Sequence, residues 1–452
     1  MPASPDDSLP HVVIIGGGFA GLEAARRLRK ERVRITLLDK RNHHLFQPLL
    51  YQVAMAGLAG PDIAAPIRTI LRKQRNVTVL MHQVLGVDLA ARKVRLADSD
   101  LRYDYLVVAA GARTFYFGKR EWKQHARGLK TIEDALRLRT RILMAFEIAE
   151  TEKDPEKRRD WLTFAVIGGG PTGVEMAGAI AEMSDRTMER NFRNIDPSTA
   201  RVILVEGQDR VLGGFPEELS AKAQTQLEEL GVEMRLGRFV KSVGDDGVQL
   251  EDEFIPARTV IWAAGVRAQD LTETMSVELD RQKRIRVGPD LRIPGHDTAF
   301  AVGDIAHFEQ GGQALPGVAP VALQQGRHAA QAIRDLLRGR TPKPFRYLDK
   351  GSMATIGRSR AVAVTGQGRR WPSGGKGWRT SGFLAWITWV FVHVYFLVGF
   401  RNRFIVLMEW ARAYFSWQRS ARVIHETREN LPRFAELPQA PDLPVLREDE
   451  LD

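Results

Sequence analysis

A strand–glycine–helix motif occurs twice in this sequence and constrains the fold more than any other feature. A short apolar segment runs into Gly-x-Gly-x-x-Gly and then into an Ala-rich segment at residues 11–27, and the same order returns at residues 164–180. Glycines at these positions allow a tight turn and let backbone N–H groups approach a pyrophosphate at the start of a helix. Two copies therefore predict that one chain binds two dinucleotides. The motif glycines are Gly16, Gly18 and Gly21 in the first copy and Gly168, Gly170 and Gly173 in the second.

An acidic residue ends the next predicted strand of each copy. Asp39 closes residues 34–39 and Glu206 closes residues 201–206, the latter after a longer polar connection at Ser184–Ala200. A carboxylate at this place binds a ribose 2′-OH and repels a 2′-phosphate, which favours NAD(H) over NADP(H) in the second copy. The alternative is that both are ordinary acids at strand ends.

The duplication extends beyond the glycines. Each copy ends in an apolar segment followed by Ala-Ala-Gly, with Ala110 and Gly111 in the first and Gly265 in the second. Internal duplication of this length indicates two units of one architecture. The sequence therefore predicts an α/β protein with two Rossmann-like dinucleotide-binding domains.

Composition excludes several kinds of site. The chain has no cysteine, which rules out disulfides, thiolate metal sites and redox-active thiol pairs. His43 and His44 are adjacent, so on a strand they face opposite sides and we expect no shared metal. The formal net charge of +11 indicates an anionic partner. No nucleic-acid module is visible, so we expect an anionic membrane surface and no nucleic acid.

The C-terminal region suggests how such a surface is contacted. Residues 381–400 contain no charged side chain, and residues 404–417 form an amphipathic pattern behind Arg401 and Arg403. Three interpretations stay open: an interfacial anchor, a membrane-spanning helix, or packing within a soluble core or dimer interface. We expect the first, a peripheral, monotopic attachment. The polar start of the chain predicts no signal peptide, which puts the attachment on the cytoplasmic face of the inner (cell) membrane.

Several further blocks give the chain a family resemblance. His43–Ala54 read HHLFQPLLYQVA, Ala301–Ala306 read AVGDIA, and Gly351–Arg358 read GSMATIGR. With the glycine motifs, this order resembles the type II NADH dehydrogenases, the non-proton-pumping NADH:quinone oxidoreductases, among the flavoproteins with two dinucleotide-binding domains. The resemblance covers residues 11–424.

The resemblance implies a role for individual residues. The first unit would hold non-covalent FAD and the second would hold NADH, with Glu206 and Gly265 on the nicotinamide cofactor. Glu175, Gln324 and Lys350 would lie at the catalytic centre, Glu175 near the nicotinamide–flavin stack and Lys350, with Met353, along the flavin and the quinone opening. Besides the first glycine motif, the residues that would contact FAD are Asp39, Lys40, Val84, Ala110, Gly111 and Asp304.

One departure from the family weakens the quinone assignment. The family often has Ala-Gln-x-x-x-Gln beside the flavin, whereas here Pro320 stands in place of the first Gln and Gln324 in place of the second. We expect a helix over Gln324–Leu337. Alternatively, Gln324 and Gln325 only cap the N-terminus of that helix above the flavin.

The resemblance also implies a glutathione-reductase-like organisation. Residues 1–125 and 286–345 would form the FAD domain, 126–285 the NADH domain, and 346–452 a C-terminal domain with membrane-anchoring helices at 381–425. The expected activity is hydride transfer from NADH to FAD, followed by two-electron reduction of a membrane quinone. The alternatives are a soluble NADH-dependent reductase of a ferredoxin-like protein and a non-enzymatic NADH-sensing flavoprotein. A homodimer stays open.

Overall fold

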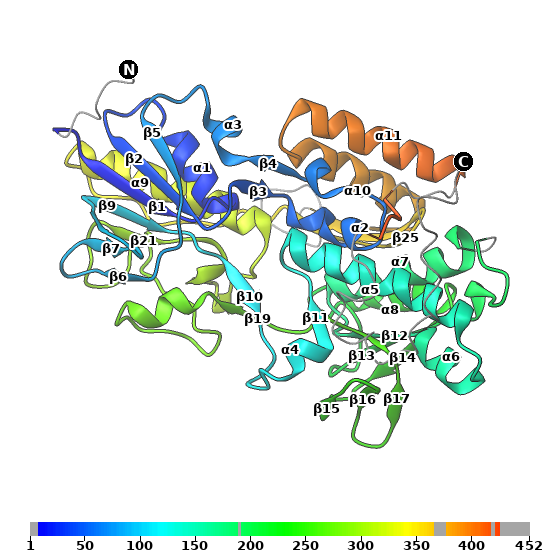
Figure 1. Cartoon of the computed structure of the whole chain (residues 1–452). Helices are drawn as coiled ribbons and strands as arrows, with labels where there is room; N and C mark the ends of the chain where they lie inside the picture. Colours follow the sequence, from blue (N-terminus) through cyan, green and yellow to red (C-terminus); the bar gives the residue numbers. More distant parts are fainter. Residues whose placement is uncertain (1–7, 189–190, 366–376, 417–420, 425–452) are drawn as a thin grey trace, which may run out of the picture.

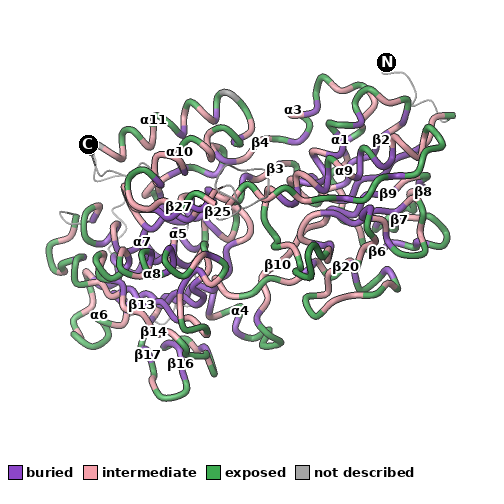
Figure 2. The backbone as a smooth tube through the Cα atoms, turned by 180° about the vertical axis from the view of Figure 1, so that it is seen from behind, coloured by how far each residue is buried: buried purple, intermediate pink, exposed green. Residues whose placement is uncertain are grey.

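The computed structural model describes residues 8–188, 191–365, 377–416 and 421–424 of the chain. Two parallel sheets of five strands dominate it, each with its own buried core (Figures 1 and 2). An antiparallel sheet and two helices form the C-terminal part, above the second sheet in Figure 1.

The first sheet carries the first glycine motif. Its strand order is β21-β9-β1-β2-β5, and every neighbouring pair is parallel. All five residues of the central strand β1 are buried, as expected for a strand covered on both faces. The strands are β1 (His11–Ile15), β2 (Arg34–Asp39), β5 (Val77–Met81), β9 (Tyr105–Val108) and β21 (Ala299–Ala301).

Alternate residues of β1 point into two different cores. Val12 and Ile14 pack with residues of helices α1 (Phe19–Arg27) and α9 (Ala319–Leu337). Val13 and Ile15 pack against an antiparallel meander on the opposite face. The meander strands are β6 (Gly86–Asp88), β7 (Lys93–Arg95) and β8 (Asp100–Arg102). We call this assembly the first unit.

The second unit repeats the same plan. Its parallel sheet has the order β11-β18-β12-β13-β14, with helices on one face and the meander β15-β16-β17 on the other. The strands are β11 (Ala126–Gly128), β12 (Thr163–Ile167), β13 (Arg201–Glu206), β14 (Val232–Leu236), β15 (Ser242–Val243), β16 (Gly247–Gln249), β17 (Phe254–Pro256) and β18 (Thr259–Trp262). The covering helices are α5 (Ile132–Thr151), α7 (Pro171–Glu182) and α8 (Glu217–Glu228).

Short elements join these parts. The two units are linked by an antiparallel strand pair, β10 (Ala112–Thr114) with β19 (Val266–Ala268). The remaining short elements are β3 (His43–Leu45), α2 (Leu50–Ala54), β4 (Ala64–Pro66), α3 (Ile67–Leu71), α4 (Trp122–His125), α6 (Pro155–Trp161), β20 (Ile285–Arg286), β22 (Ala306–His307), β23 (Glu309–Gln310), β24 (Gln313–Ala314) and six single helical turns, among them η1 (Gln47–Leu49), η2 (Gly60–Asp62) and η6 (Gly303–Ile305).

The C-terminal part is a three-stranded antiparallel sheet covered by two helices. The sheet contains β25 (Gly351–Gly357), β26 (Arg360–Thr365) and β27 (Trp378–Ser381). Helix α10 (Phe383–Phe396) packs Ala385 against Ala361 and Ala363 of β26. Helix α11 (Phe400–Ser416) is tied to the first unit by Asn402, whose side-chain amide donates to the carbonyls of Pro61 and Ala64 at 3.2 Å each.

The apolar segment at residues 381–400 is not one continuous helix. Helix α10 has 14 residues, which span about 21 Å against the roughly 30 Å of a bilayer core. It ends because Leu397 is extended and Gly399 has φ +93°, after which α11 starts at Phe400. Within the described ranges, no helix combines the length and the apolar character needed to cross a membrane. The expected helices at 381–425 are thus α10 and α11, and residues 417–420 and 425 lie outside the described part.

Candidate functional site

The glycine loop after β1 has no room for side chains on its inner side. Gly16 has φ +104°, and a Cβ there would lie 2.3 Å from the carbonyl oxygen of Ala109. A Cβ on Gly21 would lie 1.9 Å from the Gly16 carbonyl oxygen, so the helix and loop can approach only with glycine at this position. At Gly18, by contrast, no atom lies within 4 Å of the Cβ position. Gly18 therefore faces an open cradle at the N-terminus of α1, which is the place for a pyrophosphate.

The loop after β12 repeats this geometry. Gly168 has φ +108°, and a Cβ there would lie 2.7 Å from the backbone nitrogen of Ala264. A Cβ on Gly173 would lie 1.7 Å from the Gly168 carbonyl oxygen, and the Cβ position of Gly170 is again open. Both predicted glycine motifs thus form a cradle of the kind that accepts a dinucleotide.

The two predicted acids lie beside these cradles. Asp39 accepts hydrogen bonds from the N–H groups of Gly17 at 2.7 Å and Arg41 at 2.8 Å. Glu206 accepts from Gly169 at 2.5 Å and from Gln208 at 2.8 Å. Each carboxylate is therefore held against its own glycine loop, where the ribose next to a bound pyrophosphate would lie.

The other residues predicted for the first cradle come from several segments. Gly111 follows β9 with φ +72° and an open Cβ position, and Ala110 precedes it. Lys40 follows Asp39 and is exposed, while Val84 lies between β5 and β6 and packs against the core of this unit. Gly265 occupies the place of Gly111 in the second unit, with the same φ of +72°.

Asp304 reaches the first unit from the far end of the sequence. It lies in the turn η6, directly after Gly303, whose N–H donates to Gln325 Oε1 at 2.7 Å. Lys130, which lies near Asp304, was not predicted from the sequence. Burial lowers the pKa of the Lys130 ammonium, and the Asp304 carboxylate opposes this shift. The only signal for Lys130 was its place directly before Thr131, which caps α5 by accepting from Asp134 N–H.

Helix α9 starts earlier than predicted. It begins at Ala319 with Pro320 in its first turn, where a missing N–H costs nothing, so Gln324 lies inside the helix and does not cap its N-terminus. The Gln324 side chain holds the segment before β25 by exchanging two hydrogen bonds of 3.0 Å with the backbone of Leu348. Lys350 follows in this segment and is exposed.

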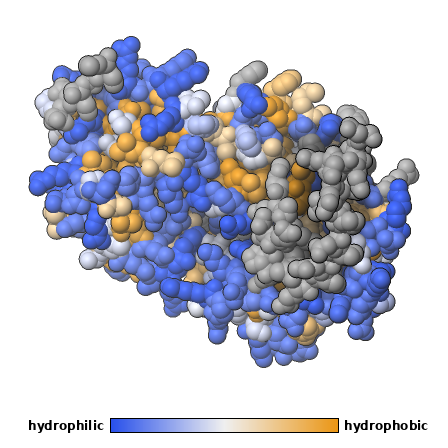
Figure 3. All heavy atoms as spheres, in the orientation of Figure 1, coloured by the Kyte–Doolittle hydropathy of each residue, from blue (hydrophilic) through white to orange (hydrophobic). Residues whose placement is uncertain are grey.

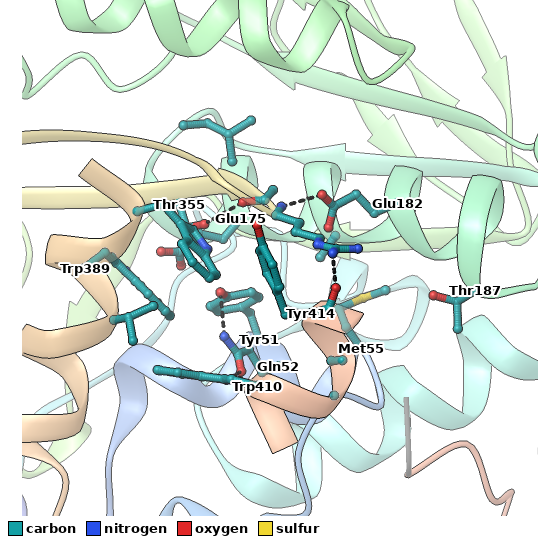
Figure 4. Close-up of a pocket in the computed structure, with 18 residues that line it drawn as sticks. Tyr51, Gln52, Met55, Glu175, Glu182, Thr187, Thr355, Trp389, Trp410 and Tyr414 are labelled. Atoms are coloured by element: carbon teal, nitrogen blue, oxygen red, sulfur yellow. Dashed lines mark hydrogen bonds between the residues drawn. The ribbon is translucent and has the colours of Figure 1, made fainter. Parts of the chain in front are cut away.

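Glu175 lies in a cavity of about 140 Å³ between the second unit and the C-terminal helices (Figure 4). Enclosure by protein raises the pKa of its carboxyl well above the usual range, and a hydrogen bond from the Thr355 backbone opposes this shift. Aromatic side chains dominate the walls. The lining includes Tyr51, Gln52 and Met55 from the α2 region, Thr355 and Arg358 from the β25 region, and Trp386, Trp389, Trp410 and Tyr414 from α10 and α11.

Hydrogen bonds fix the walls of this cavity. Gln52 donates to the Tyr51 hydroxyl at 2.9 Å and accepts from Trp410 Nε1 at 2.6 Å. The backbone N–H of Arg358 donates to the carboxylate of Glu182 in α7, and its guanidinium donates to the Tyr414 carbonyl. Tyr51, Gln52 and Arg358 belong to two of the family blocks quoted above, but nothing in those blocks indicates that these residues meet around Glu175.

Two histidines, His44 and His393, support a loop and a helix by contacting backbone carbonyl groups. The Nδ1 atom of the buried His44 ring lies 3.0 Å from the Gly17 carbonyl oxygen. This contact supports the first glycine loop. Burial lowers the pKa of His393 to about 4, so at neutral pH this ring is uncharged and Nδ1 donates to the Trp389 carbonyl at 2.7 Å. No group of three or more metal-ligating side chains occurs in the described part of the chain.

Family models match most of the chain. Residues 10–326 match the pyridine nucleotide-disulphide oxidoreductase family, and residues 350–417 match the NDH2 C-terminal domain. The sequence contains no cysteine, so it shares the architecture of the first family without a disulfide.

Two solved structures illustrate the likeness of fold. NDH2 from Plasmodium falciparum in complex with NADH has a TM-score of 0.82 at 18% identity, covering 92% of this chain and 100% of that one. The sulfide:quinone oxidoreductase of Aquifex aeolicus has a TM-score of 0.72 at 19% identity, covering 90% and 95%. At these identities the likeness concerns the fold.

Sequence relatives define the family more narrowly. A type II NADH:quinone oxidoreductase of Mycobacterium tuberculosis is 44% identical over 94% of this chain and 93% of its own length. One of Staphylococcus haemolyticus is 32% identical over 78% of this chain and 89% of its own. This chain belongs to the type II NADH:quinone oxidoreductases.

Proposed function

We propose that this protein oxidises NADH through bound FAD and passes two electrons to a membrane quinone. The observation that carries the proposal is the repeated cradle, with a carboxylate held against each glycine loop of one chain. Two dinucleotide sites in one chain fit a reaction in which one dinucleotide is the donor and the other is the carrier.

The first cradle suits FAD. Its open position at Gly18 would accept a pyrophosphate, Asp39 would bind the adenosine ribose, and the half-buried Lys130 would supply a cation near Asp304. When bound, FAD accepts hydride from NADH and gives up electrons to an acceptor. Without cysteine the chain offers no thioether link, so we expect the flavin to be non-covalent. The second cradle would hold NADH, with Glu206 on its ribose.

The cavity at Glu175 supplies what a quinone needs. Aromatic walls bind an apolar ring, and the raised pKa of the Glu175 carboxyl keeps it protonated to a higher pH than an exposed glutamate. A quinone takes up two protons with its two electrons, so a protonated carboxyl beside it can donate one. Glu175 would therefore keep and deliver a proton, with the Thr355 backbone fixing its orientation.

The exposed side of α10 and α11 would rest on the membrane. Leu384, Phe391 and Tyr395 are each about 70% exposed, and Phe404 and Met408 more than half. Figure 3 shows apolar side chains in the upper middle of the molecule, where Figure 1 places these helices. Apolar rings beside arginines are the pattern of an interfacial helix on anionic lipid. The arginines are Arg401, Arg403 and Arg412.

Replacing exposed rings tests this attachment without touching the core. We expect Phe391→Glu with Tyr395→Glu to abolish binding to phosphatidylglycerol vesicles and to leave the flavin content unchanged. Phe254→Glu is the matched control, because this exposed ring lies on β17 in the second unit. Full vesicle binding by the double variant would contradict the attachment, as would a wild-type dimer that buries these rings in the absence of lipid.

The electron acceptor is tested with the purified protein in detergent. We expect NADH oxidation with a short-chain ubiquinone or menaquinone and almost none with a ferredoxin-like protein. Heating in acid should release FAD, identified by its mass. Efficient ferredoxin reduction without quinone reduction would favour a soluble reductase, and the absence of both would favour an NADH sensor.

A further inference from the structure

Hydrogen bonds align the two units residue by residue beyond the glycine loops. Directly after β5 of the first unit, the N–H of His82 donates to the carbonyl of Asp39 at 2.8 Å. After β14 of the second unit, the N–H of Arg238 donates to the carbonyl of Glu206 at 3.0 Å. His82 and Arg238 therefore occupy equivalent positions, each bonded to the acid of its unit.

The same register continues into the meanders. Three residues after His82, the N–H of Leu85 donates to the Arg95 carbonyl at 2.9 Å. Three residues after Arg238, the N–H of Lys241 donates to the Gln249 carbonyl at 2.8 Å. No residue is inserted between these points in either unit, so Gln83 and Phe239 are structural equivalents.

Phe239 is an unusual side chain for its place. The ring is 63% exposed, although an aromatic ring is stabilised by burial. It lies so close to Gly207 that a Cβ there would be 2.6 Å from the Cε1 atom of the ring. Gly207 directly follows Glu206, so the exposed ring is fixed beside the carboxylate that would bind the ribose.

We propose that Phe239 is the stacking platform for the adenine of NADH. The proposal rests on the placement of NADH in the second unit. Adenine is joined to the ribose beside Glu206, so it must lie on the surface next to that carboxylate, and Phe239 offers an aromatic face there. Stacking on such a ring needs no hydrogen-bond pattern and keeps the base in place while the nicotinamide reacts.

The equivalent Gln83 gives the first unit no aromatic face. A resident cofactor is held along its whole length, whereas a substrate that enters and leaves gains from a rigid platform at its non-reacting end. The platform thus belongs to the unit whose dinucleotide exchanges at each turnover.

Substitution of Phe239 in the full-length holoenzyme tests the proposal. We expect Phe239→Ala to weaken binding of ADP-ribose, which contains the adenosine, by about 5- to 150-fold in calorimetry. KM for NADH should rise by a similar factor with kcat unchanged. Reduced nicotinamide mononucleotide, which lacks adenosine, should be oxidised with the same kcat/KM by variant and wild type.

Three further variants make the result specific. Phe239→Trp should restore ADP-ribose binding and Phe239→Leu should restore it only in part, because leucine covers Gly207 without an aromatic face. Phe254→Ala should change nothing. Equal losses with both substrates, or unchanged ADP-ribose binding in Phe239→Ala, would overturn the proposal. Failure of the quinone reaction would not, because ADP-ribose binding is measured without turnover.

Discussion

The two units have nearly the same backbone and different surroundings. The N–H of Gly16 donates to Leu38 and that of Gly168 to Val205, both at 2.7 Å. The N–H of Ala109 donates to the carbonyl of Ile15 in β1, and the N–H of Ala263 donates to the carbonyl of Ile167 in β12, both at 2.8 Å. These backbone hydrogen bonds therefore cannot decide which nucleotide each unit binds. That preference must come from the side chains around the two cradles.

Glu23 and Glu175 show how the surroundings act. Each lies two residues after the last glycine of its motif, on α1 and on α7. Glu23 is paired with Arg27 at 2.8 Å and with Arg327 at 3.1 Å, so it is a structural ion pair between α1 and α9. No cation within the described residues acts on the Glu175 carboxyl, and enclosure by protein raises its pKa instead. The same motif position thus forms an ion pair in one unit and, in the proposed reaction, would supply a proton in the other.

We expect the largest effects from substitutions that fill one cradle and leave the other open. Gly18 and Gly170 both have φ −71° and an open Cβ position, so valine fits the protein at either place but fills the cradle. We expect Gly18→Val to lose bound FAD and all activity. Gly170→Val should keep the flavin spectrum and lose its reduction by NADH. Flavin loss from both variants in equal measure would break the assignment of one nucleotide to each unit.

Replacement of the two equivalent glutamates should give a smaller effect. Glu175→Gln should slow quinone reduction by about a hundredfold or more, with NADH reduction of the flavin unchanged. Glu23→Gln is the matched control and should change thermal stability only. In the wild type, quinone reduction should fall as pH rises through the raised pKa, since only the protonated carboxyl donates. A Glu175→Gln variant that keeps both the rate and the pH profile would rule out the proton role.

The two ribose-side acids should give the smallest change. Glu206→Gln should narrow the preference for NADH over NADPH by about tenfold, because a negative charge no longer opposes the 2′-phosphate. Asp39→Asn should leave that preference unchanged and weaken FAD retention. The measurement is kcat/KM for both nucleotides with a water-soluble quinone. Equal use of NADPH by the wild type would contradict the role of Glu206.

Local backbone requirements explain what could be predicted from the sequence. The glycine loops could be predicted because they need glycine at a fixed spacing, and Asp39 and Glu206 because each ends the next strand of its copy. The early start of α9 was missed because Pro320 was read only as a departure from a motif, although it fits a first helical turn.

Features assembled from distant segments could not be read. The cavity around Glu175 joins residues 51–57, 175–187, 355–358 and 386–414, which only the folded chain brings together. The apolar segment 381–400 looked continuous because hydropathy does not register the turn at Gly399. The equivalence of Gln83 and Phe239 follows from backbone hydrogen bonds and leaves no trace in a motif.

An anaerobic titration tests most directly whether one chain couples its two nucleotide sites to a quinone. One equivalent of NADH per bound flavin should bleach the oxidised flavin spectrum of the wild-type protein in detergent. One equivalent of a short-chain quinone should then restore that spectrum and yield quinol. A flavin that NADH does not bleach, or one that stays reduced after the quinone is added, would contradict the account.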